Sequence, residues 1–408
     1  MLDPDVMREA TRLTRAGQLV EATALLQRML GGEAAPDMTS RTSAGMWRRP
    51  PRLIDAKVER IEEPDRPRLS RAAPELPMPR ESLPHAKRRS APDRRGVAPC
   101  APLPTPDSLP ERARFVAGTY SNSAGSRAYK LYIPSRGQGH PLPLVVMLHG
   151  CTQSPDDFAA GTRMNIVAEQ QPCLVVYPAQ HRQANPAKCW NWFRPTDQQR
   201  DRGEPSIIAG ITRQIMRDYP VDPRRVYVAG LSAGAAAAAV MGAAYPDLYA
   251  AIGVHSGLAS GAAVDLPSAL TAMRHGGSAG SGEPADMSAI PPDAPFVPTI
   301  VFHGDRDITV HPSNGGHIIE RSVRNTSTQK QVHRGRVPGG HAYIRTIHRD
   351  ANGRIIFEHW DIHGAGHAWS GGSPNGSYTD PRGPDATKEM LRFFLEHALP
   401  RQLGESRS

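Results

Sequence analysis

Residues 226–234 read VYVAGLSAG, and an alanine-rich segment follows them to residue 244. The apolar beginning predicts a buried strand and the alanine-rich segment predicts a helix, so Ser232 is expected at the turn between them. A serine hydroxyl is a weak nucleophile unless a sharp turn presents it beside a base and free backbone N–H groups. Gly230 and Gly234 fit such a turn, because a Cβ would clash with the crowded backbone. The stretch therefore indicates a nucleophilic serine.

From about residue 114, predicted strands alternate with predicted helices. This alternation predicts an α/β fold with a mostly parallel, doubly wound sheet. Residues 259–294 interrupt it with many Gly, Ser, Ala and Pro residues, which indicates a lid or a loose loop. The predicted strands are residues 115–120 and 129–133, which form an antiparallel opening pair, followed by 144–148, 174–177, 250–254, 299–302 and 355–360; the predicted helices are 156–170, 206–219 and 388–397.

Composition divides the chain into four segments. Residues 1–31 predict a short helical hairpin that is similar to half of a tetratricopeptide repeat. We expect this hairpin to self-associate, to dock on the catalytic domain or to bind a partner, with a passive cap as the alternative. Residues 32–112 are rich in Pro and Arg and predict a disordered linker. The catalytic domain is expected at residues 113–400, and a disordered tail at 401–408.

The basic charge of the chain is concentrated in the predicted linker. The net charge is +9, and residues 41–100 carry 15 Lys and Arg against 8 Asp and Glu. A basic tether can bind nucleic acid or an anionic surface. However, Trp47 is the one Phe, Trp or Tyr among residues 41–100, which is too few for the aromatic interleaving of a nucleic-acid groove, so a solvated linker without a nucleic-acid partner is expected.

The N-terminal residues and the lengths of the apolar runs indicate whether the chain is expected to be secreted or to span a membrane. No apolar run approaches the roughly 18–20 residues that span a bilayer, so no membrane span is expected. The acidic start lacks the basic region and apolar core of a secretory signal, which predicts a cytoplasmic protein. The four cysteines include no pair with zinc-ligand spacing. We therefore expect no metal and no other cofactor.

Two segments that follow predicted strands contain the candidate acids and bases. Asp305 and Asp307 lie in one segment, and His363 and His367 lie in the other. A carboxylate in such a position can orient a histidine and stabilise its cation after it takes the serine proton. The chain order Ser, Asp, His is the order of the α/β-hydrolases. Residue type alone leaves both choices, between the two aspartates and between the two histidines, open.

A third loop supplies candidate donors for an oxyanion. Residues 149–153 read HGCTQ and follow the predicted strand 144–148. The backbone N–H of Cys151 is expected to pair with that of Ala233, because two such donors stabilise the oxyanion of acyl transfer by several kcal/mol. His255 ends another strand at the same edge of the sheet and is expected to have a structural role.

Five motifs together resemble the polyhydroxybutyrate depolymerase family of esterases, within the α/β-hydrolase superfamily. They are residues 149–153 (HGCTQ), 189–193 (CWNWF), 230–234 (GLSAG), 303–307 (HGDRD) and 364–372 (GAGHAWSGG). The resemblance covers residues 114–398 and says nothing about residues 1–110. It implies hydrolysis of short-chain 3-hydroxyalkanoate esters, with feruloyl and acetylxylan esterases as close relatives.

The resemblance also implies roles for particular residues. It selects Asp307 as the triad acid and His367 as the base. It implies that Cys151 and Cys189 lie close together and form a disulfide; two free thiols are the alternative. A disulfide and the family itself imply an extracellular protein, which conflicts with the missing signal sequence. Three tryptophans of these motifs, Trp190, Trp192 and Trp369, are candidates for substrate contact, with core packing as the alternative.

The predicted function is therefore that of a serine esterase. Its expected substrates are poly(3-hydroxyalkanoate) or poly(3-hydroxybutyrate), their oligomers or a small ester, cleaved by Ser232, His367 and Asp307 through an acyl-enzyme. One alternative is a feruloyl or acetylxylan esterase that acts on plant polysaccharide esters. An alternative of another class is a protein that binds a polymer granule or a partner.

Overall fold

The computed structural model describes residues 110–137, 139–276, 297–323 and 326–401. The hairpin predicted at residues 1–31 lies outside these ranges, as do residues 32–109 of the predicted linker and 402–408 of the predicted tail. Within the described residues, no helix combines the length and the apolar character that crossing a membrane requires.

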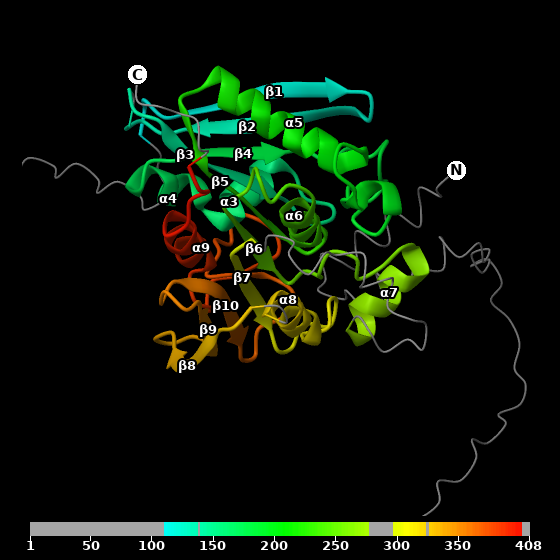
Figure 1. The fold of residues 1–408 in the computed structure, drawn as a ribbon, viewed down its shortest axis with the longest axis vertical. Helices are drawn as coiled ribbons and strands as arrows, with labels where there is room; N and C mark the ends of the chain where they lie inside the picture. Colours follow the sequence, from blue (N-terminus) through cyan, green and yellow to red (C-terminus); the bar gives the residue numbers. More distant parts are fainter. Residues whose placement is uncertain (1–109, 138, 277–296, 324–325, 402–408) are drawn as a thin grey trace, which may run out of the picture. The chain divides into compact units, whose positions relative to one another are not determined.

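A large twisted sheet forms the centre of the described residues (Figure 1). Its strands lie in the order β1-β2-β4-β3-β5-β6-β7-β10-β9-β8, and the six from β4 to β10 pair in parallel, while both flanks pair antiparallel. The predicted mostly parallel α/β sheet is therefore confirmed. The strands are β1 (Arg114–Asn122), β2 (Gly125–Ile133), β3 (Leu142–Leu148), β4 (Leu174–Pro178), β5 (Val221–Leu231), β6 (Ala251–His255), β7 (Thr299–Gly304), β8 (Gln329–Arg336), β9 (Ala342–Arg349) and β10 (Ile355–Ile362); a separate pair consists of β11 (Trp369–Ser370) and β12 (Thr379–Asp380).

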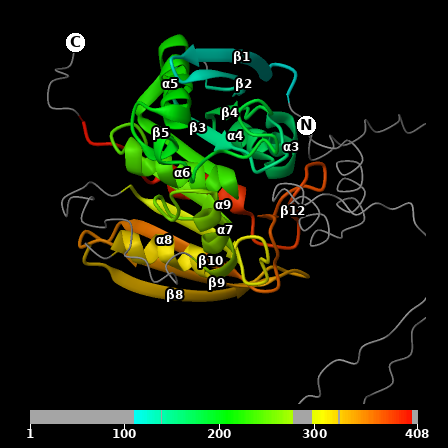
Figure 2. The ribbon, with the colours of Figure 1, turned by 90° about the vertical axis from the view of Figure 1, so that its right-hand side faces the viewer.

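Helices cover both faces of this sheet (Figure 2). Side chains alternate along β3, so that Val146 packs in a core with α5, α6 and α8, while Val145 and Met147 pack in a second core with α3, α4 and α9. This period of two is why the central strands are apolar at every position: both faces are buried. The helices are α3 (Pro155–Thr162), α4 (Met164–Gln170), α5 (Gly203–Asp218), α6 (Ala233–Ala244), α7 (Leu266–His275), α8 (Ser313–Val323) and α9 (Ala386–Leu395), with a short 3₁₀ helix, η1 (Pro195–Gln198).

The structure differs from the sequence predictions in several places, and α8, η1, β11 and β12 are among the elements that were not predicted. The single helix predicted at 156–170 is two helices, because Arg163 adopts a left-handed conformation with φ of 57° that ends α3 and starts α4. Part of the loose loop predicted at 259–294 is helix α7, which begins at a capping box between Asp265 and Ser268. Strands β8 and β9 were not predicted. Strand β8 is exposed at nearly every position and so lacks the apolar alternation that indicates a strand.

Candidate active site

Ser232 lies at the tight turn between β5 and α6. Its backbone has φ of 58° and ψ of −121°, a strained conformation for a residue with a Cβ. The turn packs tightly on the end of β3, because a Cβ on Gly234 would lie 2.1 Å from the Leu148 carbonyl oxygen. The Ser232 N–H donates to the His255 carbonyl oxygen over 2.9 Å. Strand, turn and helix thus hold the hydroxyl at the carboxyl edge of the sheet, as the G-x-S-x-G motif requires.

Asp307 and His367 form a buried pair at the same edge of the sheet. The Asp307 Oδ2 accepts a hydrogen bond from the His367 Nδ1 over 2.7 Å, with side-chain exposures of 0% and 12%. The other carboxylate oxygen accepts the N–H groups of Thr309 and Val310 over 2.9 Å each. Burial raises the pKa of Asp307, but the hydrogen bonds from His303 and His367 lower it by more, so the pKa lies well below its usual value. The carboxylate is therefore charged and able to orient the imidazole.

A second Asp–His pair lies on the surface beside the first. His363 Nδ1 is 3.0 Å from Asp305 Oδ2, and the two side chains are 44% and 43% exposed. The Asp305 carboxylate also accepts the Gly364 N–H over 2.7 Å. This pair therefore ties the β7–α8 loop to the loop that carries His367. Burial distinguishes the two pairs and favours the Asp307–His367 pair, because water weakens the exposed pair more than the buried one; the choice of triad acid and base stays a prediction.

His303 is a residue near the site whose role the sequence did not indicate. Its side chain is buried, and Nε2 lies 2.9 Å from the Val310 carbonyl oxygen and 3.5 Å from Asp307 Oδ2. The ring thus lies near the same carboxylate oxygen, Oδ2, that accepts the hydrogen bond from His367. Its position in the HGDRD motif was the only sequence feature that could have drawn attention to it.

His255 joins the serine turn to the loop that follows His367. Its carbonyl oxygen accepts the Ser232 N–H, and its ring Nε2 accepts the Ser370 N–H over 2.9 Å. The ring stacks between Phe302 and Trp369, with centroid distances of 5.7 Å and 5.0 Å. One buried histidine therefore contacts both segments on which the relative position of Ser232 and His367 depends.

The loop of residues 149–153 lies beside the serine turn. A Cβ on Gly150 would lie 3.7 Å from the Ser232 Cβ and 3.4 Å from the Leu231 carbonyl oxygen. The Cys151 N–H donates to no acceptor within the described residues. The Ala233 N–H is the first of α6 and therefore has no acceptor within that helix. Both donors predicted for an oxyanion are thus available at this edge.

A disulfide joins Cys151 to Cys189, with a Cα–Cα distance of 4.2 Å. It links the oxyanion loop after β3 to the loop that follows β4. Among the described residues the remaining cysteine, Cys173, is free and buried. The disulfide implied by the family resemblance is therefore present in the structure, and the alternative of two free thiols is not.

Reduction of the Cys151–Cys189 disulfide is expected to lower the free energy of unfolding by about 4 kcal/mol. The cross-link closes a segment with a sequence separation of 38, and restricting the unfolded chain by a loop of that size has about this effect. Urea unfolding with and without a thiol reductant measures it. A variant with both cysteines replaced by alanine should unfold at the lower midpoint in both conditions, and a reductant effect that persists in this variant would contradict the prediction.

The histidines His149 and His255 give stability a predictable pH dependence. Burial lowers the pKa of His149 to about 4 and that of His255 to about 3, whereas an unfolded histidine titrates near about 6.5. As pH falls from about 6.5 to about 4, the unfolded chain takes up protons that the native state does not. The free energy of unfolding should then fall by roughly 1 kcal/mol per pH unit for each histidine.

Urea unfolding at pH 7, 6 and 5 tests this dependence, with His255→Gln as the comparison. The variant keeps a polar side chain near Ser370 but removes one titrating group, so its slope should be smaller by roughly 1 kcal/mol per pH unit. Equal slopes in the two proteins would show that His255 is not held neutral in the native state.

The three tryptophans predicted as substrate contacts are buried. Trp190 is 0% exposed, Trp192 is 6% exposed and Trp369 is 1% exposed. The Trp190 Nε1 donates to the His149 carbonyl oxygen, and the Trp369 Nε1 donates to Thr387 Oγ1. Substrate contact stays a prediction, and the burial favours the alternative of core packing. Within the described residues, no group of three His, Cys, Asp or Glu side chains is arranged to hold a metal ion.

Comparisons with known proteins agree with this architecture. The family model described as Esterase PHB depolymerase matches residues 127–331. The poly(3-hydroxyalkanoate) depolymerase C of Paucimonas lemoignei is 32% identical over 251 residues, which are 61% of this chain and 60% of that protein. A probable acetylxylan esterase A of Aspergillus clavatus is 30% identical over 193 residues, which are 45% of this chain and 61% of that protein. The chain thus spans about 60% of the length of these curated relatives.

Among solved structures, the acetyl xylan esterase from Aspergillus awamori has the same fold. It superposes with a TM-score of 0.52 at 19% identity and covers 70% of this chain and 99% of its own. The sheet order and the strained serine turn, together with this likeness, define the fold as that of an α/β-hydrolase. Because the family model matches half of the chain, the protein belongs to the Esterase PHB depolymerase family.

Proposed function

We propose that this protein is a serine esterase that cleaves carboxylic esters through an acyl-enzyme. The observation that carries the proposal is the buried pair of Asp307 and His367, 2.7 Å apart, at the same edge of the sheet as the strained turn of Ser232. A charged carboxylate, a histidine that it orients and a serine presented by a sharp turn are the parts that nucleophilic ester hydrolysis needs.

The reaction proceeds in two halves. His367 takes the proton of Ser232 as Oγ attacks the ester carbonyl carbon, and Asp307 stabilises the imidazolium. The N–H groups of Cys151 and Ala233 donate to the oxyanion. The ester C–O bond then breaks, and the alcohol leaves with the proton from His367. Water attacks the acyl-enzyme by the same route, which releases the acid and restores the serine.

For the substrate we propose poly(3-hydroxybutyrate), a related short-chain polyester or its oligomers. The family match and the 32% identity to a poly(3-hydroxyalkanoate) depolymerase support this choice. An acetyl or feruloyl ester of plant polysaccharide is the second candidate, which the 30% identity to a probable acetylxylan esterase supports. Both candidates use the same catalytic residues and differ in the acyl group.

The substrate is tested by release of 3-hydroxybutyrate from amorphous poly(3-hydroxybutyrate), with Ser232→Ala as the control. Release by the purified protein that disappears in the variant is the expected result. No release, together with Ser232-dependent cleavage of a small acetyl or feruloyl ester, would keep the mechanism and assign the second substrate class. Absence of turnover with all of these esters would leave the polymer-binding or partner-binding alternative.

A further inference from the structure

The two peptide groups that follow His149 have four polar groups, and three of them are bound by the protein. The Trp190 Nε1 donates to the His149 carbonyl oxygen over 3.1 Å, and the Gly150 N–H donates to Gln153 Oε1 over 2.9 Å. The Gly150 carbonyl oxygen is 2.7 Å from His149 Nδ1 and accepts the Gln153 N–H over 3.4 Å. Within the described residues, only the fourth group, the Cys151 N–H, has no partner. Cys151 is only partly buried, so this N–H is free to donate to an acceptor from outside the protein.

The contact between His149 and Gly150 determines where that free N–H points. A carbonyl oxygen can only accept, so His149 Nδ1 must carry the proton and donate it. A trans peptide is planar, and its C=O and N–H point in opposite directions. Holding the Gly150 carbonyl oxygen therefore also fixes the direction of the Cys151 N–H. The loop lies beside the serine turn, because a Cβ on Gly150 would be 3.7 Å from the Ser232 Cβ.

The other side of the His149 ring keeps it in the required tautomer. The Gln180 N–H donates to His149 Nε2 over 3.0 Å, so Nε2 must be unprotonated and Nδ1 must carry the hydrogen. Burial lowers the pKa of His149 to about 4, which keeps the ring neutral at neutral pH. The ring also lies against Trp190, with centroids 5.8 Å apart. The position of the imidazole, its neutral state and its tautomer are therefore all fixed by its surroundings.

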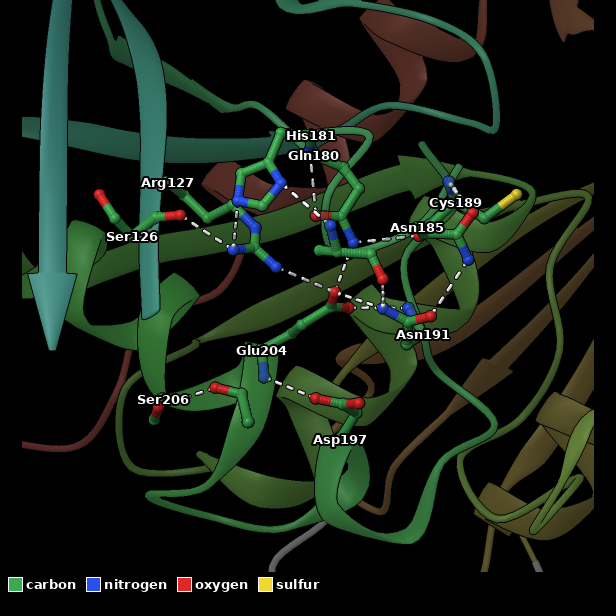
Figure 3. Close-up of polar contacts among 12 residues, drawn as sticks. Ser126, Arg127, Gln180, His181, Asn185, Cys189, Asn191, Asp197, Glu204 and Ser206 are labelled. Carbon is green, nitrogen blue, oxygen red and sulfur yellow. Dashed lines mark hydrogen bonds and ion pairs between the residues drawn. The ribbon is translucent and has the colours of Figure 1, made fainter. Parts of the chain in front are cut away.

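A buried carboxylate, Glu204, organises the polar residues around Gln180 (Figure 3). It accepts hydrogen bonds from the Gln180 side chain and, over 2.7 Å, from the Asn191 N–H, and it pairs with Arg127 at 3.3 Å. The Gln180 side chain also donates to the Cys189 carbonyl oxygen over 3.0 Å. Gln180, whose N–H fixes the tautomer of His149, is thus hydrogen-bonded through its side chain to Cys189, the disulfide partner of Cys151.

We propose that His149 and Gln153 are positioning residues that clamp Gly150 by its carbonyl oxygen and its N–H, so that the Cys151 N–H points at the oxyanion of the reaction. Neither side chain needs to touch the substrate. The inference rests on the proposed esterase activity, because an oriented donor matters to a reaction that develops negative charge on oxygen. It adds to that activity the residues that prepare half of the oxyanion hole before the substrate arrives.

Two substitutions of His149 separate its two hydrogen bonds. In His149→Asn the side-chain amide can occupy the position of Nδ1 and donate to the Gly150 carbonyl oxygen. In His149→Gln the longer amide reaches the position of Nε2 and leaves that carbonyl oxygen without its donor. We expect kcat for a small p-nitrophenyl ester to fall about 100-fold in His149→Gln, with KM changed less than about threefold. In His149→Asn, kcat should recover to within about tenfold of the wild type.

A structural role alone would give a different pattern, since both variants would then lose activity in proportion to stability. Equal losses of kcat in the two variants, or unchanged kcat in His149→Gln, would overturn the proposal. Crystal structures give a readout that does not depend on turnover. The Gly150–Cys151 peptide should rotate in His149→Gln and keep its orientation in His149→Asn, and an unrotated peptide in His149→Gln would overturn the proposal even if the wild type hydrolyses none of the tested esters.

Gln153→Met is the second variant if the His149 variants do not fold. Methionine keeps the length of the side chain but removes the acceptor of the Gly150 N–H, and it leaves His149 unchanged. We expect kcat to fall about tenfold with KM unchanged, because Gly150, the residue before Cys151, is then held by its carbonyl oxygen only. An unchanged kcat in a folded Gln153→Met protein would remove Gln153 from the proposal, and with it the clamp.

Discussion

Ser232→Ala is expected to lower kcat for a small ester by roughly 10⁵-fold, because the acyl-enzyme can no longer form and only the oxyanion donors and substrate binding remain. The folded state should be little affected. Alanine keeps the Cβ and adopts the same strained backbone, with φ of 58°, and the Ser232 N–H still donates to the His255 carbonyl oxygen. Initial rates with p-nitrophenyl butyrate and urea unfolding measure the two quantities.

Ser256→Ala provides a matched control for this substitution. Ser256 is also a buried serine with positive φ, 50°, at the end of a parallel strand. Its hydroxyl lies 3.2 Å from His255 Nδ1, but His255 Nε2 accepts the Ser370 N–H, so Nδ1 carries the hydrogen and cannot accept a proton from Ser256. We expect kcat of this variant to stay within about tenfold of the wild type. Residual activity of several per cent in Ser232→Ala would show that another group is the nucleophile.

Asp307→Asn is expected to lower kcat by roughly 10⁴-fold without unfolding the protein. The carboxylate holds the proton of His367 on Nδ1, which leaves Nε2 free to take the serine proton. An asparagine that donates its amide to Nδ1 favours the opposite tautomer, in which Nε2 carries the hydrogen and cannot act as a base. Rates at saturating ester, with a circular dichroism spectrum to verify folding, measure the effect.

Asp305→Asn is the control for Asp307→Asn, since it changes the same chemical group two residues away in the exposed pair with His363. We expect this variant to keep kcat within about tenfold, because an exposed pair contributes less than about 1 kcal/mol. A large loss in Asp305→Asn combined with a small loss in Asp307→Asn would reverse the assignment of the triad acid.

The lowered pKa of Asp307 also makes the free energy of unfolding depend on pH in acid. The pKa of Asp307 in the folded state lies below its ordinary value. The pair therefore contributes stability at pH values above about 4, where the unfolded carboxyl is ionised. That contribution is lost as pH falls toward the folded-state pKa. Asp307→Asn should therefore flatten the loss of stability in acid, which urea unfolding below pH 5 detects.

Local patterns in the sequence determined the central sheet and the serine turn. Apolar runs at the β3, β4, β5, β6 and β7 positions are buried on both faces, so their character is visible without knowledge of the partner strands. The serine turn could be predicted because its glycines, its strand and its helix are adjacent in the chain. The same reasoning failed for β8, since an exposed edge strand buries few apolar side chains and so lacks an apolar pattern in its sequence. It also failed for β9, which lies between β10 and β8 and is only partly buried at most positions.

Tertiary structure alone decided which side chains meet. Asp307 and His367 are 60 residues apart, and His255 and Ser370 are 115 residues apart. The two candidate aspartates are two residues apart in the sequence, and the two candidate histidines are four residues apart. Residue type therefore could not show which Asp–His pair is buried and which is exposed. The tautomer of His149 likewise depends on Gln180, 31 residues away. Sequence shows burial through residue type and period, but hydrogen bonds and charge states depend on the direction of side chains from distant segments, which only the folded chain fixes.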